Sequence, residues 1–237
     1  MKKVVLEWYR DLLGEKLKYE QELAIHPLKN RKILINYPGA EGDIHGYNRK
    51  YETLANHIVD SELAAVVRSG NPYVGKWDTS IRKMLDYVLE HSQEICGSKE
   101  PELYLMGFSA GAGSISTLAW EYPEVTKILL MAPAIGVGED AVAKGLRQFT
   151  GEVYIVIGDS DEVVKPTAGE IFFNFCDVAS RKELFVIEDC DHQFKEKKNG
   201  RILSHAPFYA FLDEKPVFPD YDAGIFLYEW SYPRCYY

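Results

Sequence analysis

Short runs of apolar residues recur along this chain of 237 residues, and turn residues follow each run. The runs are apolar throughout and rich in branched or large side chains, which is typical of strands covered on both faces of a parallel sheet. They occupy residues 33–35, 63–67, 103–106, 128–131, 153–157 and 184–187. We therefore predict a strand at each of these positions.

The first 30 residues carry a different pattern. Residues 17–25 place Leu17, Tyr19, Leu23 and Ile25 at a two-residue period, which indicates a further strand. Residues 4–9 fit either a strand or the start of a helix. The pattern alone leaves these two alternatives open.

Apolar residues at helical spacing separate several of these strands. Residues 81–89 place apolar side chains at i, i+3, i+4, i+7 and i+8, and Thr79 or Ser80 is a candidate N-cap for that helix. Residues 115–122 and 171–176 each form a further apolar helical face, and Pro123 ends the first of them. Strands that alternate with helices predict an α/β fold with a mostly parallel central sheet and helices on both faces.

Ligands of such sheets bind at the carboxyl ends of the strands, so candidate chemistry is sought there. The predicted strand at 103–106 runs into Gly107-Phe108-Ser109-Ala110-Gly111, a G-x-S-x-G pattern with a small-residue helix behind it. A sharp strand-to-helix turn exposes such a serine hydroxyl, and the amide of Ala110 then faces a developing oxyanion. Ser109 is therefore the candidate nucleophile.

A serine hydroxyl needs a general base, and the base needs a group that orients it. Of the six histidines, His192 follows the last predicted strand and is therefore expected at the same sheet end as Ser109. The segment after the strand at 153–157 offers Asp159, Asp161 and Glu162 for orientation. The alternative is that its aspartates only cap the next turn.

In this arrangement the chain resembles the α/β-hydrolase superfamily, over roughly residues 15–213. The order Ser109, Asp161, His192 is that family's order of nucleophile, acid and base, and the resemblance of residues 158–164 to its acid loop favours Asp161 over Asp159. Residues 37–42 resemble its oxyanion loop. This implies a second oxyanion donor at the amide of Ala40, with that of Glu41 as the alternative.

The connection between the strands at 128–131 and 153–157 has room for one short helix, so we expect no cap domain. The resemblance is thus to compact, lidless esterases, thioesterases and dienelactone-hydrolase-like enzymes. Candidate substrate contacts on the loops at this sheet end are Tyr73, Trp77, Ile135 and Val163. Arg68 and Lys165 are candidates for holding an anionic group.

The resemblance implies a serine hydrolase that cleaves an ester or thioester of a small acyl or aryl substrate through an acyl-enzyme. No metal or organic cofactor is required for that chemistry. The alternatives are a peptidase, amidase or acyltransferase on the same three residues, or a non-catalytic binding module that has kept the fold.

The composition of the chain argues against some classes of binding partner. The chain is 46% hydrophobic and 27% charged, and its formal net charge of −9 argues against nucleic acid and anionic membranes as partners. The four cysteines form no CxxC pair, and the first residues lack the apolar core of a signal peptide. We therefore expect a cytoplasmic protein with free thiols and a small-molecule substrate.

We expect one domain over residues 1–237, in which residues 214–237 form an aromatic C-terminal extension. So aromatic a segment is not expected to be a disordered tail. It is expected to pack either on its own domain or on a second subunit of a homo-oligomer, and the sequence does not choose between them.

Overall fold

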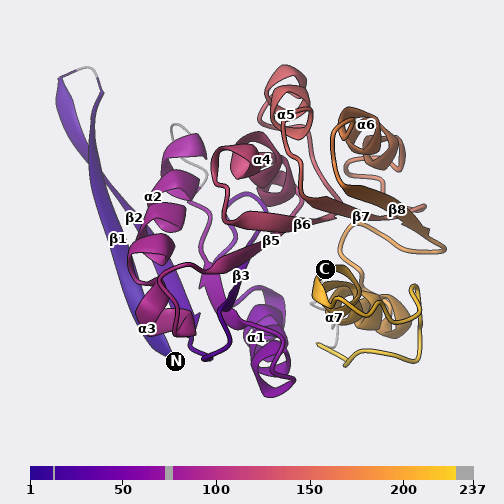
Figure 1. Cartoon of the computed structure of the whole chain (residues 1–237). Helices are drawn as coiled ribbons and strands as arrows, with labels where there is room; N and C mark the ends of the chain where they lie inside the picture. Colours follow the sequence, from indigo (N-terminus) through magenta and orange to yellow (C-terminus); the bar gives the residue numbers. More distant parts are fainter. Residues whose placement is uncertain (13, 73–76, 228–237) are drawn as a thin grey trace, which may run out of the picture.

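The computed structural model describes residues 1–12, 14–72 and 77–227, and its strands form a single eight-stranded sheet (Figure 1). The strands are β1 (Lys2–Leu12), β2 (Glu15–His26), β3 (Lys32–Tyr37), β4 (Ala65–Ser69), β5 (Glu102–Phe108), β6 (Val125–Met131), β7 (Glu152–Gly158) and β8 (Arg181–Ile187). Their order across the sheet is β1-β2-β4-β3-β5-β6-β7-β8. Strands β3 to β8 are parallel, whereas β2 is antiparallel to both β1 and β4. The mostly parallel sheet is confirmed.

Helices cover both faces of the sheet, as predicted. They are α1 (Lys50–Asp60), α2 (Trp77–Glu90), α3 (Ser92–Cys96), α4 (Ala110–Leu118), α5 (Glu139–Leu146), α6 (Thr167–Phe175) and α7 (Lys197–Phe211), with 3-10 turns at Tyr47–Arg49 and Ala119–Glu121. Helices α2 to α6 contribute to one apolar core, and α1 and α7 contribute to the other (Figure 1). Ile33 and Ile35 of β3 enter the first core and Leu34 enters the second, as the two-residue period of a strand requires.

The two N-terminal segments form a hairpin of β1 and β2, so the strand predicted at residues 17–25 is present. Residues 4–9 therefore belong to a strand. The predicted helix at 81–89 exists but begins at Trp77, so the proposed caps Thr79 and Ser80 lie inside α2. Between β6 and β7 the chain forms only the eight-residue helix α5, which agrees with the expected lack of a cap domain.

The described part of the C-terminal extension packs on its own chain. The Ser204 hydroxyl of α7 donates to the Ile225 carbonyl at 2.8 Å, and the Phe218 ring lies edge-on to Phe185 and tilted against Tyr209. The aromatic residues from Tyr228 to Tyr237 lie outside the described residues. Among the residues described, every helix is too short or too polar to cross a bilayer.

Burial predicts which valines contribute to the free energy of unfolding. Val153 in β7 is fully buried, whereas Val217 in the C-terminal extension is 77% exposed. Val153→Ala is expected to lower the free energy of unfolding by about 2–3 kcal/mol, because it removes buried methyl groups and leaves a cavity. The same change at Val217 is expected to alter it by less than about 0.5 kcal/mol. Urea denaturation of the two variants measures both values, and equal losses would contradict this account of the core.

Candidate active site

Ser109 occupies the sharp turn between β5 and α4. Its backbone has φ 53° and ψ −121°, a conformation that a non-glycine residue adopts only under constraint. The constraint comes from its neighbours: the Ser109 amide donates to the Met131 carbonyl at 2.9 Å, and the Ser109 carbonyl accepts from the Ala134 amide at 3.1 Å. The side chain is half-buried and projects beyond the carboxyl end of the sheet.

The last glycine of the G-x-S-x-G pattern permits a close approach. A Cβ at Gly111 would overlap the carbonyl oxygens of Pro38 and Tyr37. The start of α4 therefore packs directly on the loop that follows β3. A Cβ built on Gly39 in that loop would lie 3.3 Å from the Ser109 Cβ, so the loop borders the serine.

Asp161 lies in the loop after β7 and is 1% exposed. One carboxylate oxygen, Oδ1, accepts from the amides of Val163 and Val164 at 2.9 and 3.0 Å. The other oxygen, Oδ2, lies 2.7 Å from His192 Nδ1. Asp159 is exposed and accepts a hydrogen bond from the Ser160 hydroxyl at 2.9 Å. Of the two aspartates, Asp161 is the one that the fold places against the histidine.

His192 lies between β8 and α7 and is 6% exposed. Its Nε2 is 3.1 Å from the Ser109 Oγ. The Phe108 ring lies beside the imidazole, with 5.4 Å between the ring centroids. The neighbouring Asp191 faces a different group, because its Oδ1 accepts from the amides of Gln193 and Lys195. The three residues Ser109, His192 and Asp161 thus form one continuous chain of contacts.

The order of contacts determines which nitrogen of His192 carries the proton. An ionised carboxylate only accepts hydrogen bonds, so Nδ1 must donate to Asp161. In the neutral imidazole Nε2 is then the acceptor, and it faces the Ser109 hydroxyl. This arrangement is suited to removing a proton from the serine.

Contact between two loops brings the aspartate and the histidine together. The Ser160 amide donates to the Cys190 carbonyl at 3.1 Å, and the Asp159 amide donates to the Ile187 carbonyl at 3.0 Å. A Cβ at Gly158 would overlap the Cys190 carbonyl oxygen. Only glycine at the end of β7 allows this approach.

The loop after β3 turns sharply at Ala40 and Glu41. The Gly42 amide donates to the Gly39 carbonyl at 3.0 Å, and Glu41 has φ 58°. Ala40 is exposed and lies next to Gly39, which borders Ser109. Ala110 is the first residue of α4, so its amide has no acceptor within that helix. Ala110 thus directly follows Ser109 in the chain, whereas Ala40 follows the residue that borders Ser109 on a different loop.

Asn71 holds this loop at two points. Its side-chain Nδ2 donates to the Pro38 carbonyl at 3.0 Å, and its backbone amide donates to the Gly42 carbonyl at 2.8 Å. Burial raises the pKa of Tyr37 to about 12, so the Tyr37 hydroxyl stays protonated and donates to Asn71 Oδ1 at 3.3 Å. That bond leaves the Nδ2 of Asn71 directed at Pro38.

Arg68 also holds the loop after β3. Its side chain is fully buried, its Nη1 donates to the Ile44 carbonyl, and its Nε donates to His26 Nε2 at 3.1 Å. It is thus unsuited to the expected role of holding an anionic substrate group. Burial, followed by the charge of Arg68, lowers the pKa of His26 to about 4.

The remaining candidate contacts are placed differently. Val163 is 68% exposed beside Asp161, and Ile135 is half-buried against the core on the α4 side. Tyr73 lies outside the described residues, as does the side chain of Trp77, the first residue of α2. Their role in substrate binding remains a prediction.

Sequence reasoning missed Asn71 and Phe108. Asn71 belongs to a Ser-Gly-Asn-Pro segment that was interpreted only as a turn, although it directly follows the β4 run. Its position after a parallel strand is the signal that would have marked it. Phe108 is the first of the two unspecified residues of the G-x-S-x-G pattern, which carries no information about its side chain.

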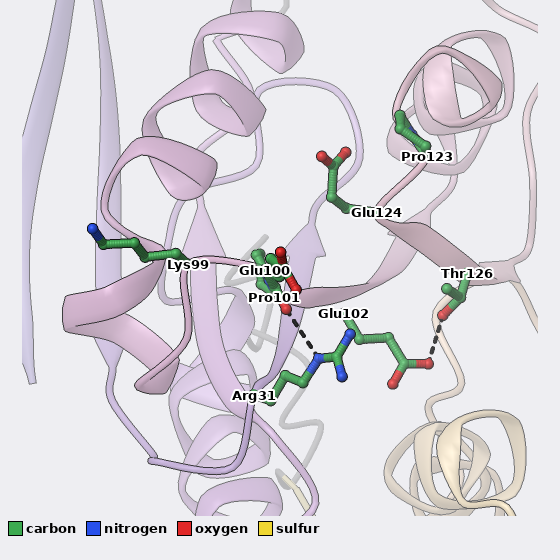
Figure 2. A pocket seen from close by; sticks show the side chains of 8 residues that line it. All are labelled: Arg31, Lys99, Glu100, Pro101, Glu102, Pro123, Glu124 and Thr126. Atoms are coloured by element: carbon green, nitrogen blue, oxygen red, sulfur yellow. Dashed lines mark hydrogen bonds between the residues drawn. The ribbon is translucent and has the colours of Figure 1, made fainter.

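A cavity of about 420 Å³ opens at the opposite end of the sheet (Figure 2). Arg31 lies in it, with Nε donating to the Glu100 carbonyl at 3.0 Å, and Thr126 donates to the Glu102 carboxylate at 2.8 Å. Glu102 begins β5, whereas Ser109 follows its end. A seven-residue strand spans about 20 Å, so this cavity is separate from the serine.

Comparison with solved structures identifies the α/β-hydrolase fold. An alpha-beta serine hydrolase homologue from Coxiella burnetii is 23% identical, with a TM-score of 0.55 over 80% of this chain and 89% of that one. Est1E from Butyrivibrio proteoclasticus, with ferulic acid bound, is 18% identical, with a TM-score of 0.56 over 78% and 90%. A putative hydrolase from Agrobacterium vitis S4 is 13% identical, with a TM-score of 0.66 over 90% and 100%. No family model and no curated protein matches the sequence.

The buried pair of His26 and Arg68 predicts a loss of stability in acid. The pKa of His26 is about 4 in the folded chain, against an ordinary value near 6.5 when unfolded. Between these values the unfolded chain binds more protons, so the free energy of unfolding falls as the pH falls, by at most about 1.4 kcal/mol per pH unit. His26→Gln should lose this contribution. Urea denaturation of both proteins from pH 7 to pH 4.5 measures it, and identical pH profiles would contradict it.

Proposed function

We propose that the chain is a serine hydrolase that cleaves an ester or thioester of a small acyl or aryl substrate. The observation that carries the proposal is the contact chain from Asp161 through His192 to Ser109, with 2.7 Å and 3.1 Å between the successive polar atoms. A serine at positive φ, a histidine that accepts at Nε2 and a buried carboxylate are the parts of a nucleophilic relay. The α/β-hydrolase fold supports the same interpretation.

In the proposed reaction, Ser109 Oγ attacks the carbonyl carbon of the substrate while His192 Nε2 takes its proton. Asp161 keeps the imidazole in the required tautomer and stabilises the imidazolium through the bond to Nδ1. His192 then returns the proton to the leaving alkoxide or thiolate, and an acyl-enzyme remains on Ser109. A water molecule, deprotonated by His192, then attacks the acyl carbon. The bond from that carbon to Ser109 Oγ breaks, His192 returns the proton to Ser109 Oγ, and the acid is released.

The oxyanion of each tetrahedral intermediate requires donors that are already in place. We assign this role to the amides of Ala110 and Ala40, with the Glu41 amide as the alternative to the second. The support is the position of Ala110 at the start of α4 and the approach of Gly39 to within contact of Ser109. Donors held by the backbone cost no reorganisation when charge develops.

The connection between β6 and β7 adds only the short helix α5 and no cap domain. We take this as support for a small substrate. Exposed Val163 beside the acid loop favours an apolar acyl or aryl group at the surface. Est1E, whose structure contains ferulic acid, has the same fold, and short acyl and aryl esters are therefore the first substrates to test.

Covalent labelling tests the proposed nucleophile. The purified protein is treated with a fluorophosphonate, and the intact mass is measured beside that of the Ser109→Ala variant. We expect one adduct on the parent chain and none on the variant, because only an activated serine attacks the phosphorus centre at an appreciable rate. Turnover of aryl esters should fall in the variant by at least about 10³-fold.

The other outcomes separate the alternatives. Labelling with turnover of amides indicates a peptidase or amidase, and product formation that needs an acyl acceptor indicates an acyltransferase. A folded parent chain that takes no label would refute the proposed relay. Ligand binding retained in Ser109→Ala would then favour a binding module.

The contacts of Asn71 predict that its substitution lowers turnover. Asn71→Ala removes the donor to Pro38 and leaves a buried carbonyl unpaired, so the oxyanion loop is held less firmly. We expect kcat to fall by about 10- to 100-fold with a smaller change in KM, because the loop acts mainly on the transition state. Steady-state kinetics on an aryl ester and the rate of fluorophosphonate labelling measure the loss.

Asn30 provides the matched control. Its Nδ2 also donates to two backbone carbonyls, those of Glu62 and Leu63, but at the opposite end of the sheet. Both variants should lose about 1–2 kcal/mol of stability, while only Asn71→Ala should lose turnover. Equal kinetics in the two variants would show that Asn71 has no positioning role.

A further inference from the structure

Strand β1 forms one edge of the sheet and has β2 as its neighbour over eleven residue pairs, from Lys2 with Ile25 to Leu12 with Glu15. Strand β2 in turn pairs with β4 only from Leu23 to His26 within the described part of the chain. The outer part of the hairpin therefore projects beyond the rest of the sheet, at the left of the view (Figure 1). A long projecting edge offers unpaired backbone groups to another strand.

The connection between β1 and β2 determines which residues present those groups. Leu12 is paired with Glu15, with two residues between them. In a two-residue hairpin the flanking residues form a hydrogen-bonded pair, and such pairs recur at every second residue, so we infer the same alternation here. The even-numbered residues of β1 therefore bond to β2. The odd-numbered residues direct their N–H and C=O groups outward, and their side chains are exposed; they are Lys3, Val5, Glu7, Tyr9 and Asp11.

The side chains of this row are complementary to those of a second, antiparallel copy of β1. An antiparallel copy centred on Glu7 places Lys3 opposite Asp11 and Val5 opposite Tyr9. A shift by two residues in one direction places Val5 opposite Glu7, and a shift in the other places Val5 opposite Asp11. Only the register centred on Glu7 forms two cation–carboxylate pairs and two apolar pairs, and the apolar partners are 48% and 55% exposed in the single chain.

We propose that β1 is a dimerisation strand, along which two copies of this chain pair antiparallel with Glu7 opposite Glu7 of the second copy. The pairing forms about ten backbone hydrogen bonds and continues the sheet from one subunit into the other. It goes beyond the proposed hydrolase activity and does not depend on it.

The central pair brings two carboxylates together, and each already has a cation. Glu7 Oε1 accepts from Lys18 Nζ at 2.6 Å on the same face of the hairpin. Lys18 also pairs with Glu20 at 2.6 Å, so in each copy one lysine is shared by two carboxylates. Like charges directly opposite one another are destabilising, so the two opposed glutamates are a cost that the ion pairs and apolar pairs on either side must exceed.

The other face of the hairpin fits the same register. Trp8 stacks on Tyr19 at 5.9 Å between ring centroids, and Leu6, Trp8 and Tyr19 are half-buried in the single chain. The register places Trp8 of each copy opposite Leu6 of the other. Pairing therefore joins two apolar clusters into one across the two-fold axis.

Charge reversal tests the register. Sedimentation of the parent chain should show a dimer, and Lys3→Asp should raise its dissociation constant by about tenfold, because two ion pairs become two repulsions. The double variant Lys3→Asp with Asp11→Lys should restore the dimer. A double variant as weak as the single one would refute the pairing of these residues.

Crosslinking tests the centre of the interface. Cα atoms of a hydrogen-bonded antiparallel pair lie about 5.5 Å apart, within reach of a disulfide. Oxidised Glu7→Cys should migrate at twice the mass of the chain. Val5→Cys should not, since its copies would lie about 13 Å apart along the strands. Crosslinking of both variants to the same extent would contradict the two-fold axis at Glu7.

Val5→Pro distinguishes this edge from any other interface. The amide of Val5 points outward, so proline removes a donor that the ladder between β1 and β2 does not use, and it blocks the incoming strand. We expect a folded monomer by circular dichroism and sedimentation. A dimer that persists in Val5→Pro, or a parent chain that is monomeric at about 100 µM, would overturn the proposal.

Discussion

The hydrogen bond between Asp161 and His192 depends on a close contact of two backbones. The loops after β7 and β8 touch where Gly158 faces the Cys190 carbonyl, a space that no side chain can occupy. The Ser160 amide then bonds to that carbonyl, and Asp161 reaches His192 at 2.7 Å. Parallel strands bring these loops to one edge of the sheet, but the missing Cβ sets their final separation.

The candidate site has a second half that is built independently. Ser109 meets the loop after β3 because Gly111 allows α4 to pack on the Pro38 carbonyl. That loop is held by Asn71, which donates to the Pro38 carbonyl, and by the buried Arg68, which donates to the Ile44 carbonyl. A charge such as Arg68 is costly to bury, so its hydrogen bonds to Ile44 and His26 are needed to keep it there. The loop after β3 thus depends on side-chain hydrogen bonds as well as close packing, whereas the loops after β7 and β8 are joined by backbone hydrogen bonds and a glycine contact.

The sequence predicted what depends on local patterns and missed what depends on pairing at a distance. Buried strands can be predicted because they are continuous apolar runs. The turn at Ser109 can be predicted because its pattern lies within five consecutive residues, Gly107 to Gly111. The start of α2 was misplaced, since Trp77 and Asp78 precede the apolar repeat that revealed the helix. Asn71 was missed because its partners lie more than 25 residues earlier in the chain, at Pro38 and Gly42.

The projecting hairpin is connected to the candidate site through β2. Gln21 Nε2 donates to the Ser69 hydroxyl and to the Gly70 carbonyl, and the Gly70 amide donates to the Glu22 carbonyl at 2.9 Å. Gly70 directly precedes Asn71, which holds the loop beside Ser109. A partner strand on β1 would restrain β2, and this path would carry that restraint to Asn71. Hydrogen bonds thus form a continuous path from β2 through Gly70 and Asn71 to the loop after β3, along which a restraint at the edge of the sheet would reach the candidate site without passing through the core.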